Sequence, residues 1–145
     1  MSIYNRILLA LDLSSNTDLL CRKARKLADL YQAELFLLHV NEPIITDSAF
    51  DTLPALPADF EDTLLQTARK RLEHTAAELG VKSERVFLEI GETRHEIIRV
   101  AEEQKVDLIV VGSHGRRGVA LLLGSTANAV LHHAKCDVLA VRITD

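Results

Sequence analysis

The 145-residue chain lacks several features that would assign it to a particular class of protein. No apolar run approaches the roughly 18 residues that a membrane-spanning helix needs. Residues 1–15 do not resemble a secretory signal, because their apolar run is short and Asp12 interrupts it. We therefore expect a cytoplasmic protein that folds as one domain over residues 1–145.

Cysteines and basic clusters are also scarce. Cys21 and Cys136 lie far apart and neither belongs to a CxxC pair, which argues against a structural disulfide or a zinc site. The net charge is -4, and no block of Lys or Arg forms the basic patch of a nucleic-acid-binding surface. We expect two thiols in a reducing compartment, and neither a nucleic acid nor a membrane as partner.

The motifs of common enzyme classes are missing. The chain has no Walker GK[ST] lysine, no GxSxG nucleophile elbow and no second carboxylate placed with Asp12 for metal or base chemistry. A response-regulator receiver would carry a phosphoacceptor aspartate after its third strand. The third predicted strand of this chain instead ends in Glu89, Ile90 and Gly91, which argues against a receiver domain. Slow ATP hydrolysis is compatible with the sequence, but we predict that the protein is not primarily an enzyme.

What the chain does contain is a regular alternation of buried strands and amphipathic helices. Short, nearly continuous apolar runs predict five parallel strands, at residues 6–13, 34–40, 85–90, 107–112 and 137–143. Apolar residues at helical spacing predict the helices between them, at residues 20–31, 59–79, 97–101 and 127–134. Gly80 should end the second helix, and Thr93 with Glu96 forms a capping-box pattern before the third. The alternation predicts an α/β fold of right-handed β-α-β units.

One connection is longer than the others. Residues 41–60 carry all three prolines and follow the second predicted strand, so they would lie over the carboxyl edge of the sheet. A connector of roughly 15 residues or more is often functional.

The stretch VVGSHGRRGVALLLGST, residues 110–126, holds four glycines, a histidine and two arginines. In an open α/β sheet, ligands bind beyond the carboxyl ends of the strands where the strand order reverses. If the first strand is central, this point lies between the first and fourth strands, and Asp12 lies opposite Gly112. Asp12 is suited to accept hydrogen bonds from ribose hydroxyls, although it could equally cap the first helix.

The same stretch has the composition of a phosphate-binding loop. Gly115 and Gly118 can adopt positive φ angles and turn their N–H groups inward to bind an anion. Gly124, Ser125 and Thr126 begin a helix whose free N–H groups and dipole favour a phosphate. From spacing alone, phosphate binding and a purely structural loop are about equally supported.

Together these residues resemble the universal stress protein family, in its UspA-like branch. The resemblance covers the whole chain and rests on RILLALDLS, LLHV, GETRHEII and DLIVVGSHGRRGVALLLGSTANAVLHHAKCDVLAVRI. It implies a three-layer, Rossmann-like fold of the adenine nucleotide alpha hydrolase type, with a five-stranded parallel sheet in the order 3-2-1-4-5. It also implies a homodimer that pairs through the last strand, from Val138 to Ile143.

The resemblance further implies a site for ATP or another adenine nucleotide, with any magnesium held by the phosphates. Ala10 and Val40 would contact the adenine, and Asp12 the ribose. The implied contacts with ribose and phosphates are Gly112, Gly115, Gly124, Ser125 and Thr126. ATP-binding members have nine residues between the second and third glycines, whereas this chain has only the eight residues 116–123.

The sequence is compatible with three functions. The chain could be an adenine-nucleotide-binding regulatory module of the stress response, which the glycine-rich stretch favours. It could instead be a nucleotide-free, dimeric interaction protein of the stress response with a purely structural loop, which the shortened spacer favours. A nucleotidyl or phosphoryl transferase is the third possibility, and the missing catalytic groups count against it.

Overall fold

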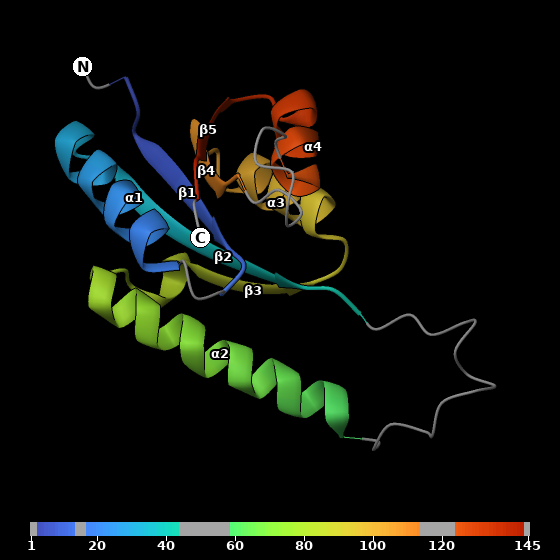
Figure 1. Ribbon diagram of the computed structural model, residues 1–145. Helices are drawn as coiled ribbons and strands as arrows, with labels where there is room; N and C mark the ends of the chain where they lie inside the picture. Colours follow the sequence, from blue (N-terminus) through green and yellow to red (C-terminus); the bar gives the residue numbers. More distant parts are fainter. Residues whose placement is uncertain (1–2, 14–16, 44–58, 114–123, 144–145) are drawn as a thin grey trace.

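Strands and helices alternate along the chain in the computed structural model, which describes residues 3–13, 17–43, 59–113 and 124–143 (Figure 1). The strands are β1 (Arg6–Leu11), β2 (Glu34–Asn41), β3 (Val86–Ile90), β4 (Leu108–Gly112) and β5 (Asp137–Val141). The helices are α1 (Thr17–Tyr31), α2 (Phe60–Leu79), α3 (Thr93–Glu103) and α4 (Ser125–His133), with a short 3-10 turn at Ser83–Arg85. Gly115, Gly118 and most of the long 41–60 connection lie outside the described residues.

All five strands pair in parallel, in the order β3-β2-β1-β4-β5. The predicted α/β class and the order 3-2-1-4-5 are therefore confirmed. β1 is central, since it pairs with β2 along Arg6–Leu11 and with β4 along residues 7–9. The strand order reverses between β1 and β4, and their carboxyl ends form the point of the sheet where ligands generally bind.

The sheet is covered on both faces, with α1 and α2 on one side and α3 and α4 on the other (Figure 1). Successive side chains of a strand point to opposite faces, so β1 contributes to both cores. Ile7 and Leu9 pack in the core formed with α1 and α2, whereas Leu8 packs in the core formed with α3 and α4. No polar or charged side chain is buried among the described residues. Polar chemistry is therefore confined to the surface and to the edges of the sheet.

Two element boundaries differ from the sequence-based prediction for identifiable reasons. β1 ends at Leu11, because Leu13 has a φ of 59°, a left-handed conformation that a strand cannot contain. Thr93 is not the N-cap of α3 but its first residue, and its hydroxyl donates to Glu42. The predicted capping box is therefore wrong.

Gly80 ends α2 as predicted. It is the C-cap residue, with a left-handed φ of 69° that glycine adopts without steric cost. Its N–H donates to a carbonyl of the last helical turn. Among the described helices, none is both long and apolar enough to cross a membrane.

Because the central strands are buried between two cores, shortening one of their side chains should lower the free energy of unfolding substantially. Leu37 of β2 is fully buried, and Leu37→Ala should lower the free energy of unfolding by about 2–5 kcal/mol through lost burial and a residual cavity. Leu30→Ala removes the same atoms from a side chain of α1 that is 74% exposed, and should change the stability by no more than about 0.5 kcal/mol. Urea denaturation of both variants measures this difference, and equal losses would contradict the assigned cores.

Candidate functional site

A cavity of about 210 Å³ opens at the carboxyl edge of the sheet, where β1 and β4 lie side by side. Seven of the eight predicted site residues line it: Ala10, Asp12, Val40, Gly112, Gly124, Ser125 and Thr126. The eighth, Gly115, lies outside the described residues. The strand order thus brings together residues from the ends of three strands and the start of α4, at the point where the strand order reverses and ligands generally bind.

One side of the cavity is apolar. The ends of β1 and β2 contribute Ala10, Leu38 and Val40, and α3 contributes Ile97. Leu38 is fully buried and Val40 is 8% exposed, so this wall is part of the core and is fixed in place. A rigid apolar wall beside a few polar groups is the usual lining for a flat, ring-shaped ligand.

The amino end of α4 forms another part of the cavity lining. Gly124 is the N-cap residue and has no side chain with which to cap the helix. Its φ of -59° and ψ of 153° are accessible to any residue, so backbone geometry does not require glycine there. Gly124 contributes no side chain to the cavity wall, and no side-chain hydrogen bond caps the first turn of α4. Such a helix start favours an anion through its free donors and its dipole.

Hydroxyl groups accompany these N–H donors. Ser125 is exposed and Thr126 is half-buried, and both line the cavity. Hydroxyls at this position can add hydrogen bonds to the oxygens of an anion.

Asp12 lies on the turn between β1 and α1, at the border of the cavity. Its side chain is exposed, whereas those of its neighbours Leu11 and Leu13 are 4% and 6% exposed. Two side chains from other elements reach the carbonyl groups on either side of it. The Nδ1 atom of His39 lies 2.7 Å from the carbonyl oxygen of Leu11, and the Arg71 guanidinium donates to the carbonyl oxygen of Leu13.

Beside the cavity, a contact joins Glu42, the residue after β2, to Thr93, the first residue of α3. The Glu42 carboxylate accepts hydrogen bonds from the Thr93 backbone N–H at 3.1 Å and from its hydroxyl at 2.8 Å. The bond from the Thr93 backbone N–H, and to a lesser extent the bond from its hydroxyl, hold the pKa of Glu42 below its ordinary value. Because Glu42 already places a negative charge at the start of α3, the start of α4 is the more favourable of these two helix starts for an anionic ligand.

The sequence did not indicate His39, Glu42 or Arg71 as residues near the site, and it assigned Thr93 a different partner, Glu96. Glu42 and Thr93 are 51 residues apart and His39 and Leu11 are 28 apart, so only the strand pairing brings each pair together. Arg71 is one of several cations along α2, and nothing in its sequence neighbourhood distinguishes it.

The described residues contain no group of three or more His, Cys, Asp or Glu side chains that could hold a metal ion. Cys21 and Cys136 are both free thiols. Burial raises the pKa of Cys21 to about 11 and also raises that of Cys136, so both remain protonated near neutral pH and are poor nucleophiles.

Comparison with known proteins agrees with the fold and the motifs. A model of the universal stress protein family matches residues 3–142. The chain belongs to this family. The universal stress protein A homolog 2 of Coxiella burnetii is 46% identical over 144 residues, which cover 99% of this chain and 98% of that protein.

Solved universal stress proteins share the architecture. The structure of MJ0577, a universal stress protein of Methanocaldococcus jannaschii, matches with a TM-score of 0.79 and 26% identity, covering 99% of both chains. A universal stress protein solved in complex with cAMP matches with a TM-score of 0.62 and 23% identity, covering 97% of this chain and 98% of that one. The UspA-like resemblance inferred from the sequence is confirmed at the level of family and fold.

The Glu42 contact predicts a pH-dependent contribution to the stability of this universal stress protein. Because the folded-state pKa of Glu42 is lowered, its contribution is complete above the unfolded value of about 4.3 and is lost as the pH falls through the folded value. Glu42 is exposed, and solvent screening reduces its contribution, so Glu42→Gln should lower the free energy of unfolding by only about 0.5 kcal/mol at about pH 7, and by almost nothing at about pH 3.

Urea denaturation at the two pH values measures this dependence. Glu73→Gln removes the same charge from the middle of α2 and serves as the control, with little effect expected at either pH. A loss for Glu42→Gln that has the same size at both pH values would show that the ionised carboxylate is not responsible.

Proposed function

We propose that this universal stress protein is a regulatory module that binds ATP or another adenine nucleotide in the cavity at the ends of β1 and β4. One observation carries the proposal: an apolar wall, an exposed carboxylate and a helix start without a side-chain cap line a single cavity. These three linings suit the three parts of a nucleotide, which are a flat base, a hydroxyl-bearing sugar and an anionic phosphate chain.

Each part of the nucleotide has a defined place in this arrangement. The adenine lies against Ala10 and Val40, and the ribose hydroxyls donate to Asp12. The phosphates accept hydrogen bonds at the start of α4, from Gly124, Ser125 and Thr126. Gly112 allows the ligand to approach the backbone closely, and Gly115, outside the described residues, is expected to add a further N–H donor.

The comparisons support the choice of an adenine nucleotide. The protein of the same fold that is solved with cAMP accepts a ligand made of an adenine, a ribose and a phosphate. The described residues offer no carboxylate cluster for a metal, so a magnesium ion entering with ATP would be held by the phosphates and by water.

We propose that the protein acts by binding a nucleotide in the cavity and not by catalysing a reaction of that nucleotide. Among the described lining residues, Asp12 is the one ionisable side chain, and neither a cysteine nor a histidine accompanies it. General acid-base or nucleophilic catalysis needs at least a second group within hydrogen-bonding reach. The alternative, a nucleotide-free interaction protein of the stress response, is favoured by the one-residue-shorter spacer at 116–123.

A charge placed at the start of α4 tests nucleotide binding. Ser125 is exposed, and a carboxylate in the first helical turn is favourable to the helix, so Ser125→Glu should retain the fold. The same charge repels a phosphate, and Ser125→Glu should lower the ATP affinity by about tenfold or more. The neutral variant Ser125→Gln has the same size and should lower it by about twofold or less.

Calorimetric titration of stripped protein with Mg-ATP measures these affinities, and chromatography of small molecules released on unfolding shows what the purified protein carries. Thermal unfolding confirms that both variants are folded. If wild-type protein releases no nucleotide and gives no heat with ATP, the nucleotide-free interaction protein becomes the better description.

We propose in addition that the protein is a homodimer paired through β5. This strand is at the edge of the sheet, and no described strand lies beyond it. Leu139 is 37% exposed there, and an apolar edge strand of this kind pairs readily with a second copy. The expected interface from Val138 to Ile143 is shortened at its end, because β5 stops at Val141 and Ile143 lines the cavity instead.

A lysine on this edge should separate the subunits. Leu139→Lys places a charge beside the pairing strand, so the variant should sediment as a monomer at concentrations where the wild type is dimeric. Leu30→Lys introduces the same charge on α1 at a more exposed leucine and should leave the dimer intact. A Leu139→Lys variant that remains dimeric would place the interface elsewhere.

A further inference from the structure

The turn that carries Asp12 has a backbone conformation that its own sequence does not favour. Leu13 has a φ of 59°, in the left-handed region that leucine rarely adopts. Its side chain is nonetheless buried in the core with α1 and α2. Non-glycine residues keep such a conformation only where the surrounding structure imposes it.

Two side chains from other elements hold the carbonyl groups on either side of Asp12. A carbonyl oxygen can only accept a hydrogen bond, so His39 must carry a proton on Nδ1 and donate it to Leu11. This bond fixes the peptide plane that includes the N–H of Asp12. Arg71 donates to the carbonyl of Leu13 on the other side.

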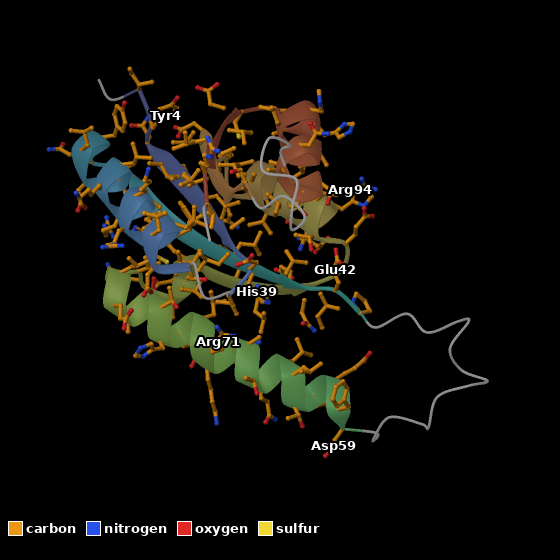
Figure 2. All side chains as sticks on the ribbon, in the orientation of Figure 1. Tyr4, His39, Glu42, Asp59, Arg71 and Arg94 are labelled. Carbon is orange, nitrogen blue, oxygen red and sulfur yellow. The ribbon has the colours of Figure 1, made fainter. Side chains whose placement is uncertain are left out.

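Arg71 reaches the turn from α2, a helix with few anchoring contacts. It rises from the face of α2 that is turned toward the sheet (Figure 2). Only Leu72 and Ala76 are buried along this 20-residue helix, and a cavity of about 270 Å³ separates part of it from β3. The partly buried Ala68 and Leu79 also pack against the core, and the charge-assisted hydrogen bond of Arg71 adds a polar contact beside Leu72.

We infer that Arg71 and His39 are positioning residues for Asp12, and that the placement of α2 thereby sets the ribose-binding end of the cavity. Neither side chain lines the cavity, so each acts through the backbone of the turn. A shift of α2 that withdraws Arg71 from Leu13 would release the turn and weaken the binding of the sugar, but not of the phosphates. The inference rests on the proposed function for the identity of the ligand.

The test compares a ligand that has a ribose with one that lacks it. Arg71→Met keeps the aliphatic stem and removes the donors, and should lower the ATP affinity by about fivefold to tenfold. Its affinity for inorganic tripolyphosphate, which only the start of α4 would bind, should stay within about twofold of wild type. Arg69→Met, on the same helix, is the matched control and should leave both affinities unchanged.

A double-mutant cycle shows whether Arg71 acts through Asp12. Asp12→Ala alone should lower the ATP affinity by about tenfold, and adding Arg71→Met should lower it no further. Independent, multiplicative losses would overturn the inference, as would equal losses for ATP and tripolyphosphate. Thermal unfolding checks that all variants are folded.

His39 offers a conservative rescue. The side-chain amide nitrogen of an asparagine lies near the place of Nδ1, so His39→Asn should retain most of the ATP affinity, whereas His39→Leu should lose about as much as Arg71→Met. Equal losses in both His39 variants would show that the donated hydrogen bond is not what matters.

Amide hydrogen exchange without any ligand separates this inference from the proposed function. Arg71→Met should speed the exchange of the Asp12 and Leu13 amides, while Arg69→Met should not. If wild-type protein binds neither ATP nor tripolyphosphate, the proposed function fails but the exchange comparison still tests the contact. Unchanged exchange in Arg71→Met would overturn the positioning role.

Discussion

A parallel sheet is stable in water only when both of its faces are covered, and this constraint determines where the protein can place polar chemistry. The two cores contain no buried polar side chain among the described residues. Polar groups are left at the two ends of the strands. At the amino ends, the Asp107 carboxylate accepts the backbone N–H groups of Asn5 and Arg6, and this closes that edge with protein contacts. The carboxyl ends keep the cavity, and they are the edge available for a ligand.

Two helix starts at the carboxyl edge, those of α3 and α4, could each bind an anion, and the Glu42 side chain distinguishes them. Both α3 and α4 begin beside the cavity, and each offers N–H donors and a favourable dipole. Glu42 supplies an internal carboxylate to Thr93 and so occupies the start of α3. Gly124 gives α4 no equivalent partner of its own. The asymmetry directs an anionic group to one end of the cavity and leaves the apolar wall at the other.

The sequence predicted the sheet well because buried parallel strands are almost continuously apolar, and the strand order then placed Asp12 near Gly112. It predicted the ends of elements less well. β1 stops at Leu11 because a turn residue is held in a left-handed conformation by side chains from β2 and α2, and such long-range contacts have no local signal. The same holds for Thr93, whose capping partner is Glu42 rather than the nearby Glu96. Spacing along the chain identified the candidate ligand-contacting residues, whereas the residues that orient them needed three-dimensional neighbours.

The helix α2 differs from the other helices in how it is held. Its carboxyl end is fixed to α1, where Arg25 donates to the carbonyl of Leu79, and its middle is fixed to the β1 turn by Arg71. Near its amino end, by contrast, α2 has exposed residues such as Leu64, which is 40% exposed. Because a charge-assisted bond from Arg71 joins the middle of α2 to this turn, a change in the placement of α2 can be transmitted to the turn through that bond. The residue between the two held carbonyls is Asp12, so the helix with the fewest buried residues is also the one that reaches the proposed ribose contact.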